Sequence, residues 1–217
     1  MHRPTSEEIA ALPLYRALPL DRIHVLRNQE QCEAAEVELR LAGHVGFDTE
    51  SKPQFVAGGE NTGPHIVQFA TADRAFIIHT EAPGTAAFLR TMLETEAVVK
   101  VGFGLASDRT PLFRKLGVAL AATVDVSRMV RRLGFKDDVG LKTAVAVVLA
   151  QRFPKSKKVT TSNWALPQLS TQQLQYAAND AHASLLVFLA LRDMGVPAPV
   201  APKSRQPRRR FASVPEF

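Results

Sequence analysis

The sequence contains very little cysteine, since Cys32 is the only one among 217 residues. A single cysteine excludes an internal disulfide and a zinc site built from several cysteines. Long hydrophobic runs are also missing, because no apolar stretch approaches the roughly 18 residues of a membrane span. The first residues, MHRPTSEEIA, have no apolar segment after their basic residues, unlike a secretory signal. These absences predict a cytoplasmic protein without a membrane partner.

The net charge of +6 at pH 7 is unevenly distributed along the chain. From residue 196 onward there are five basic residues and one acidic residue, so this end carries +4 and the rest only +2. It is rich in proline and arginine and has little apolar surface to bury. We therefore predict a disordered basic tail over 196–217.

The rest of the chain has the size and composition of one globular domain, with 46% hydrophobic residues overall. We predict an N-terminal arm over 1–22 and a domain over 23–195. Three successive strands are predicted at 44–50, 65–71 and 74–80, followed by helices and strands in alternation. This order is typical of an α/β domain with a mixed sheet flanked by helices.

A long last helix is predicted after residue 169. Ser170 and Gln173 form a capping box, and Gly195 supplies the left-handed position that ends a helix. Tyr176 and Asp180 stand four residues apart and therefore project to the same side. A phenol and a carboxylate on a partly covered face need polar partners.

The segment before this helix is predicted to be a helix over 140–153 and then a loop over 153–167. Trp164 in that loop is predicted to be a core anchor in preference to a platform for base stacking. His182 falls on a polar face of the last helix and shows no metal-ligand spacing, so a structural role is predicted for it.

Carboxylates occur at three places that a fold could bring together. Asp48 and Glu50 are two residues apart in a strand and share one face of the sheet. Asp108 lies in the first turn of a helix, and Asp180 lies on the last helix. Such a group would repel itself unless cations neutralised it, and divalent ions with oxygen ligands are suited to this. Charge near a helix N-terminus and a solvated helix face explain Asp108 and Asp180 without any site, so both interpretations stay open at this point.

Three motifs in this chain resemble those of the DEDD 3′–5′ exonuclease superfamily: FDTE, KVGFGLASDRTPLF and QLQYAANDAHASL, in that order. The Tyr-x-x-x-Asp of the third motif is typical of the DEDDy branch, in which the chain is similar to ribonuclease D and to the exonuclease domain of the Werner syndrome protein. The resemblance covers residues 23–195 and implies a ribonuclease H-like, DnaQ-like fold. It implies two Mg²⁺ or Mn²⁺ ions and four carboxylate ligands, Asp48, Glu50, Asp108 and Asp180. It also implies that Tyr176 orients the attacking water.

The resemblance further implies an enzyme that degrades DNA or RNA from a free 3′ end and releases nucleoside 5′-monophosphates by a two-metal-ion mechanism. One alternative is a ribonuclease acting on tRNA 3′ ends or short oligoribonucleotides. The other is an inactive nucleic-acid-binding module, against which the complete set of four carboxylates and a tyrosine argues. Contact to the 2′-OH leaves no sequence signature, so the choice between DNA and RNA stays open.

Basic residues are concentrated between 128 and 158, where nine of them stand against two acids. Such a concentration suits a phosphate backbone, and ordinary solubilising charge on exposed helices is the alternative. The candidates for nucleic-acid contact that lie nearest the last helix are Arg152, Lys155, Lys157 and Lys158.

Overall fold

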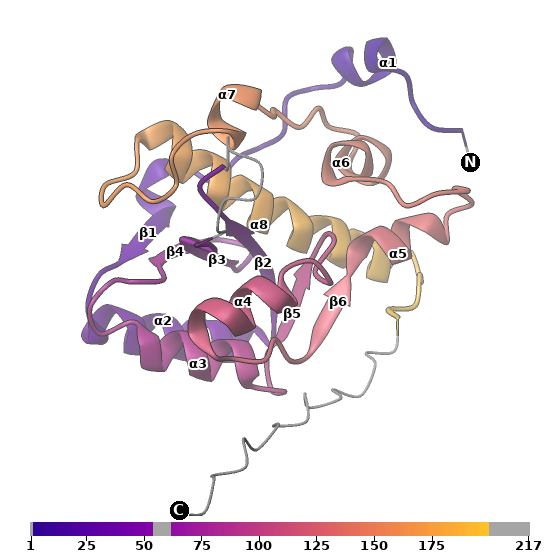
Figure 1. The fold of residues 1–217 in the computed structure, drawn as a ribbon. Helices are drawn as coiled ribbons and strands as arrows, with labels where there is room; N and C mark the ends of the chain where they lie inside the picture. The colour runs from indigo at the N-terminus through magenta and orange to yellow at the C-terminus, as the bar shows by residue number, and fades with distance from the viewer. Residues whose placement is uncertain (1, 54–61, 200–217) are drawn as a thin grey trace, which may run out of the picture.

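The computed structural model describes residues 2–53 and 62–199, so most of the predicted tail lies outside the described residues. It contains a six-stranded mixed sheet in the order β1-β4-β3-β2-β5-β6, with helices on both faces (Figure 1). The strands are β1 Ile23–Leu26, β2 His44–Glu50, β3 Ile66–Ala70, β4 Ala75–His79, β5 Val99–Gly102 and β6 Thr123–Asp125. The predicted mixed α/β fold is confirmed.

Strand β2 lies in the middle of the sheet and carries the first motif. It pairs antiparallel with β3, which pairs antiparallel with β4, so the three successive predicted strands form a meander. The other three pairings are parallel, β1 with β4, β5 with β2 and β6 with β5. The register sets Asp48 opposite Gln68 and Glu50 opposite Ile66, so both acids stand at the carboxyl end of a central strand.

In chain order the helices are α1 Ser6–Ala10, α2 Gln29–Ala42, α3 Ala86–Glu94, α4 Arg109–Leu116, α5 Val126–Arg131, α6 Leu141–Leu149, α7 Lys157–Thr160 and α8 Thr171–Asp193. Helices α2 and α3 lie on one face of the sheet and α8 lies on the other, with α5, α6 and α7 packed on α8 and α1 standing apart from the sheet (Figure 1). On one face Leu39 of α2 and Met92 of α3 pack into a cluster with Phe47 of β2. On the other face Phe188 of α8 packs with residues of α5 and α6.

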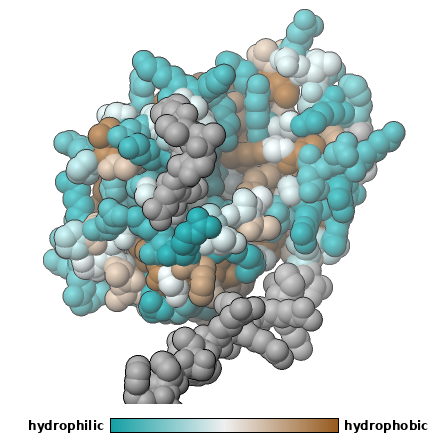
Figure 2. Space-filling model, in the orientation of Figure 1, coloured by the Kyte–Doolittle hydropathy of each residue, from teal (hydrophilic) through white to brown (hydrophobic). Residues whose placement is uncertain are grey.

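The hydrophobic side chains are largely enclosed by this packing. Figure 2 shows that hydrophilic residues dominate this view of the surface and that the hydrophobic ones lie mostly recessed between them. Among the described residues, no helix is both long enough and apolar enough to cross a membrane.

Helix α8 lies unusually close to β2, and Gly46 permits this approach. A Cβ atom at Gly46 would lie 1.9 Å from the carbonyl oxygen of Ala181, far inside any real contact. The facing residues of α8 are also small, since Ala177, Ala178 and Ala181 are fully buried. This close packing places the third motif, on α8, next to the first motif, on β2.

The predicted N-terminal arm packs on α8 and covers part of its polar face. The Tyr15 hydroxyl hydrogen-bonds with Nδ1 of His182 at 2.7 Å, and Nε2 of the same ring lies 3.0 Å from the Ala72 carbonyl oxygen. The arm is fixed further by the Tyr15 N–H, which donates to the Arg152 carbonyl at 3.0 Å. The structural role predicted for His182 is confirmed, on a face that is buried.

Two predicted boundaries before α8 are wrong. Helix α6 ends at Leu149 instead of residue 153, because Ala150 adopts a left-handed conformation with φ 51° and Arg152 pairs with the arm. The predicted loop over 153–167 contains α7, whose N-terminus is capped by the Ser156 side chain. Trp164 is fully buried and donates from Nε1 to the Thr160 carbonyl at 3.3 Å, which confirms it as a core anchor.

Candidate active site

Three of the four predicted carboxylates converge. Asp48, Glu50 and Asp180 each offer an oxygen, and these oxygens lie within 4.8 Å of one another. Strand alternation directs the first two to one face, and α8 crosses that face to add the third. Asp180 is only 3% exposed, while the other two are half-buried.

The fourth carboxylate, Asp108, is not a member of this group within the described residues. Its Oδ1 accepts a hydrogen bond from the Thr49 hydroxyl at 2.6 Å. Thr49 stands between Asp48 and Glu50 in β2. Burial and the charge of Asp180 are the main causes that raise the pKa of Asp48, and the charge of Asp108 adds a smaller contribution. Sequence reasoning missed Thr49, although its place between two motif acids was an available signal.

Burial and mutual repulsion disfavour the ionised form of the grouped carboxyls. Burial raises the pKa of Asp48 well above its ordinary value, and the charges of Asp180 and Asp108 raise it further. Burial, followed by the charge of Asp48, raises the pKa of Glu50 to about 9. Burial also raises the pKa of Asp180 despite the nearby ammonium of Lys155. Such a group favours either protons or a bound cation.

Lys155 supplies a positive charge at this group. Its Nζ lies 3.1 Å from Oδ2 of Asp180 and 5.6 Å from the centroid of the Tyr176 ring. Burial is the largest single influence and lowers the pKa of Lys155, but the charge of Asp180, the Tyr176 hydroxyl and the hydrogen bonds to both together outweigh it and raise the pKa. Lys155 was a candidate for nucleic-acid contact, and the structure places it against a carboxylate. Arg152, Lys157 and Lys158 are exposed and form no ion pair with the three acids within the described ranges.

The other carboxylate oxygen of Asp180, Oδ1, is buried and lacks a hydrogen-bond partner among the described residues. A buried carboxylate oxygen without a partner is unfavourable. Hard divalent cations bind such oxygens, so this donor set fits a divalent metal ion.

Tyr176 lies one helical turn before Asp180 and is held on both sides. Its ring packs against Trp164 with centroids 5.9 Å apart, and its hydroxyl lies 2.9 Å from the Thr160 hydroxyl. Burial, with the charge of Asp180, raises the pKa of Tyr176 to about 12. The phenol therefore keeps its proton at neutral pH and can orient a neighbouring molecule. Thr160 belongs to α7. Because a loop was predicted there, the sequence did not indicate that Thr160 contacts the Tyr176 hydroxyl.

If Lys155 balances the charge of Asp180, its removal should strengthen metal binding. We expect Lys155→Met to bind Mn²⁺ roughly 10–150-fold more tightly, since one charge-assisted hydrogen bond contributes roughly 1.5–3 kcal/mol. The metal-free variant should also melt below the parent, because Asp180 loses its partner. Calorimetric titration with Mn²⁺ measures the first effect. Lys157→Met, an exposed lysine of α7, is the matched control, and equal affinities in all three proteins would contradict the expectation.

The fold and this site define a ribonuclease H-like domain with a carboxylate centre. A family model described as 3′-5′ exonuclease matches residues 23–195, and the chain belongs to this family. The predicted resemblance is thereby confirmed at the level of the family.

Individual relatives agree with this assignment. A 3′-5′ exonuclease of Arabidopsis thaliana is 31% identical over 155 residues, covering 69% of this chain and 53% of the relative. The bifunctional 3′-5′ exonuclease/ATP-dependent helicase WRN of Mus musculus is 27% identical over 169 residues, covering 76% of this chain and 12% of the relative. The chain thus spans about half of the first relative and a small part of the second.

Solved structures support the fold. The EXO domain of Nibbler from Aedes aegypti superposes with a TM-score of 0.70 at 22% identity, covering 83% of this chain and 91% of that domain. RNase D of Escherichia coli gives a TM-score of 0.65 at 14% identity, covering 79% and 46%.

Proposed function

We propose that this protein is a metal-dependent 3′–5′ exonuclease that hydrolyses a nucleic-acid strand from its free 3′ end and releases nucleoside 5′-monophosphates. The observation that carries the proposal is the convergence of Asp48, Glu50 and Asp180 within 4.8 Å beside the buried Tyr176. Membership of the 3′-5′ exonuclease family supports the same reaction.

The carboxylates would hold two divalent cations, Mg²⁺ or Mn²⁺. Asp48, Glu50 and Asp180 form the grouped ligands, and Asp108, which accepts from the Thr49 hydroxyl, is the fourth. The ions, when bound, would supply Lewis acidity at the phosphate and a lowered pKa for the attacking water. The raised carboxyl pKa values support this role, because ligands that repel one another are stabilised by bound cations.

Tyr176 is assigned to positioning. Its hydroxyl can hold the attacking water in line with the scissile bond, since Thr160 and Trp164 fix the phenol in one place. A pKa of about 12 makes the phenol a poor proton acceptor at neutral pH. Oriented attack is therefore its main contribution.

A ribonuclease acting on tRNA 3′ ends or short oligoribonucleotides is the second candidate. The observation in its favour is the likeness to ribonuclease D structures, among them the Trypanosoma brucei RNase D complex with RNA U12, at a TM-score of 0.67. A protein distinguishes RNA from DNA through the 2′-OH, so substrate tests can decide between the two.

The direct test uses matched DNA and RNA oligonucleotides with a 5′ label, in Mg²⁺ and in Mn²⁺. We expect a ladder that shortens by single nucleotides from the 3′ end. A terminal 3′-phosphate should resist, because the reaction requires the 3′-hydroxyl near the carboxylates. The sugar of the faster substrate identifies the preferred nucleic acid. Release of internal fragments from a circular single strand would contradict an exonuclease.

A further inference from the structure

A cavity of about 650 Å³ lies beside the candidate active site. Helix α1 of the arm, helix α6, the segment 152–156 and helix α8 all contribute to its walls. It shares Lys155 and Tyr176 with the carboxylate group, so whatever enters the cavity lies next to that group. Its volume is within the usual range of small-molecule and cofactor pockets.

The lining of this cavity carries positive charge only. Lys142, Arg152 and Lys155 line it, and no aspartate or glutamate does. Lys155 is paired with Asp180, whereas Lys142 and Arg152 are exposed and form no ion pair within the part of the chain that the structure describes. Two cations without counter-charges at the mouth of one cavity favour an anionic ligand.

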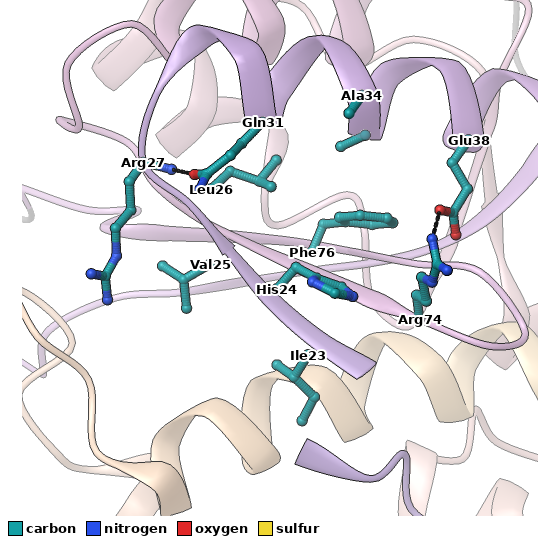
Figure 3. Close-up of a pocket in the computed structure, with 11 residues that line it drawn as sticks. Ile23, His24, Val25, Leu26, Arg27, Gln31, Ala34, Glu38, Arg74 and Phe76 are labelled. Carbon is teal, nitrogen blue, oxygen red and sulfur yellow. Dashed lines mark hydrogen bonds and ion pairs between the residues drawn. The ribbon is translucent and has the colours of Figure 1, made fainter. Parts of the chain in front are cut away.

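A second cavity, of about 560 Å³ between β1 and α2, has an acid in its lining (Figure 3). There the guanidinium of Arg74 lies 2.7 Å from Oε2 of Glu38, so an acid of the same cavity neutralises it. No candidate site residue lines it. Arg27 also lines this second cavity and forms no ion pair among the described residues, so the cavity beside α8 is distinguished by the lack of an acid in its lining and by its place next to the carboxylate group.

The remaining walls suit a nucleotide. Ile9, Phe153 and Val159 are buried and supply apolar surface, while Gln172 and Asn179 of α8 supply amide groups. Sugar and base surfaces can pack on apolar walls, and phosphates need the cations. Such a combination of stacking or apolar surface with basic side chains is common in proteins that bind single strands.

We propose that this cavity is a subsite for the strand on the 5′ side of the bond being cleaved, in which Lys142 and Arg152 bind backbone phosphates. The inference rests on the proposed function, which places the 3′ end of the strand at the carboxylates. A released nucleoside 5′-monophosphate carries the same phosphate chemistry, so the experiment separates the strand from the product.

The test measures binding without hydrolysis. The probe is a fluorescent single-stranded octanucleotide, titrated by anisotropy in EDTA at several salt concentrations. We expect the Lys142→Gln/Arg152→Gln double variant to bind about tenfold more weakly than the parent. The slope of log Kd against log salt should fall by roughly 1.4, since each single-strand phosphate contact contributes about 0.7. Parent-like affinity and slope in the double variant would overturn the proposal.

Two further variants control for charge and for folding. Arg40→Gln removes a cation from α2 on the other face of the sheet and should leave binding unchanged. Ala10→Glu introduces an acid into the lining from α1, and it should weaken binding where Ala10→Gln does not. Melting curves establish that each variant is folded. Equal binding by both Ala10 variants would count against the cavity as the binding place.

A competition arm distinguishes strand from product. Adenosine 5′-monophosphate is added to the parent and to the double variant during hydrolysis of the octanucleotide and of a dinucleotide. A strand subsite predicts a higher KM for the octanucleotide in the double variant and an unchanged kcat/KM for the dinucleotide. Loss of product inhibition with unchanged octanucleotide binding would overturn the strand assignment. Binding in EDTA does not depend on hydrolysis, so an inactive parent would refute the proposed function separately.

Discussion

Replacing Asp48 with asparagine should lower the exonuclease rate by roughly 10²–10³-fold or more, while the metal-free variant melts at or above the temperature of the parent. The loss of rate follows from removing a ligand and a charge at the reacting phosphate. The stability gain follows because the variant removes one ionisable, buried carboxyl from a group whose members repel one another, although most substitutions at ordered positions destabilise. Asparagine keeps an oxygen that can accept from the Thr49 N–H, as Oδ1 of Asp48 does at 2.9 Å.

The stability difference should depend on pH. Burial and the charge of Asp48 raise the pKa of Glu50 from its ordinary value of 4.5 to about 9. Over this interval the folded state holds a proton that the unfolded state releases, so the free energy of unfolding of the metal-free parent falls as the pH rises. Asp48→Asn weakens that repulsion, and its advantage should therefore grow between pH 5 and pH 9. Thermal melting in EDTA measures this.

Metal binding provides the second readout of the same variant. Mn²⁺ bound only to the folded parent should stabilise it by about 2.7 kcal/mol at a hundredfold excess over Kd. Asp48→Asn should lose most of that gain. Asp180→Asn should gain less stability in EDTA, because it leaves Lys155 without its partner. Asp73→Asn, away from the motifs, should show neither effect. A variant of Asp48 that melts well below the parent in EDTA and still responds fully to Mn²⁺ would refute a shared metal site.

Tyr176→Phe should lower kcat by roughly 10²–10⁴-fold, the range for losing one positioned acid–base group. The ring and its packing on Trp164 are kept, so the Mn²⁺-induced rise in melting temperature should be unchanged. Single-turnover hydrolysis of a 5′-labelled strand measures the effect on the chemical step. A parent-like rate would exclude Tyr176 from the reaction.

The other tyrosine of the chain provides a matched control. Tyr15 also packs on α8, and its hydroxyl hydrogen-bonds with His182 at 2.7 Å. Tyr15→Phe should destabilise the protein by about 1 kcal/mol, the usual contribution of one hydrogen bond, and leave the rate unchanged. If Tyr176→Phe loses rate and Tyr15→Phe loses only stability, the Tyr176 hydroxyl acts in the reaction and not merely in packing.

Local patterns in the sequence determined the elements that carry the motifs. The capping box of Ser170 and Gln173 is present, and Gly195 has a φ of 76° as its position after the helix requires. Strand alternation placed Asp48 and Glu50 on one face. These features depend on residues within a few positions of one another, for which helix and strand periods and caps are sufficient.

Only the tertiary structure decided which side chains meet. Oδ1 of Asp108 accepts a hydrogen bond from Thr49, which is 59 residues away in the chain. Lys155 donates a hydrogen bond to Asp180, which is 25 residues away. Tyr15 of the N-terminal arm hydrogen-bonds with His182, which is 167 residues away in the chain. No local period encodes these partners, because they depend on how closely α8 packs on β2 and on where the chain ends α6. The sequence by itself therefore determined the candidate acids and the helix and strands that hold them, and tertiary packing decided their partners, their burial and hence their pKa values.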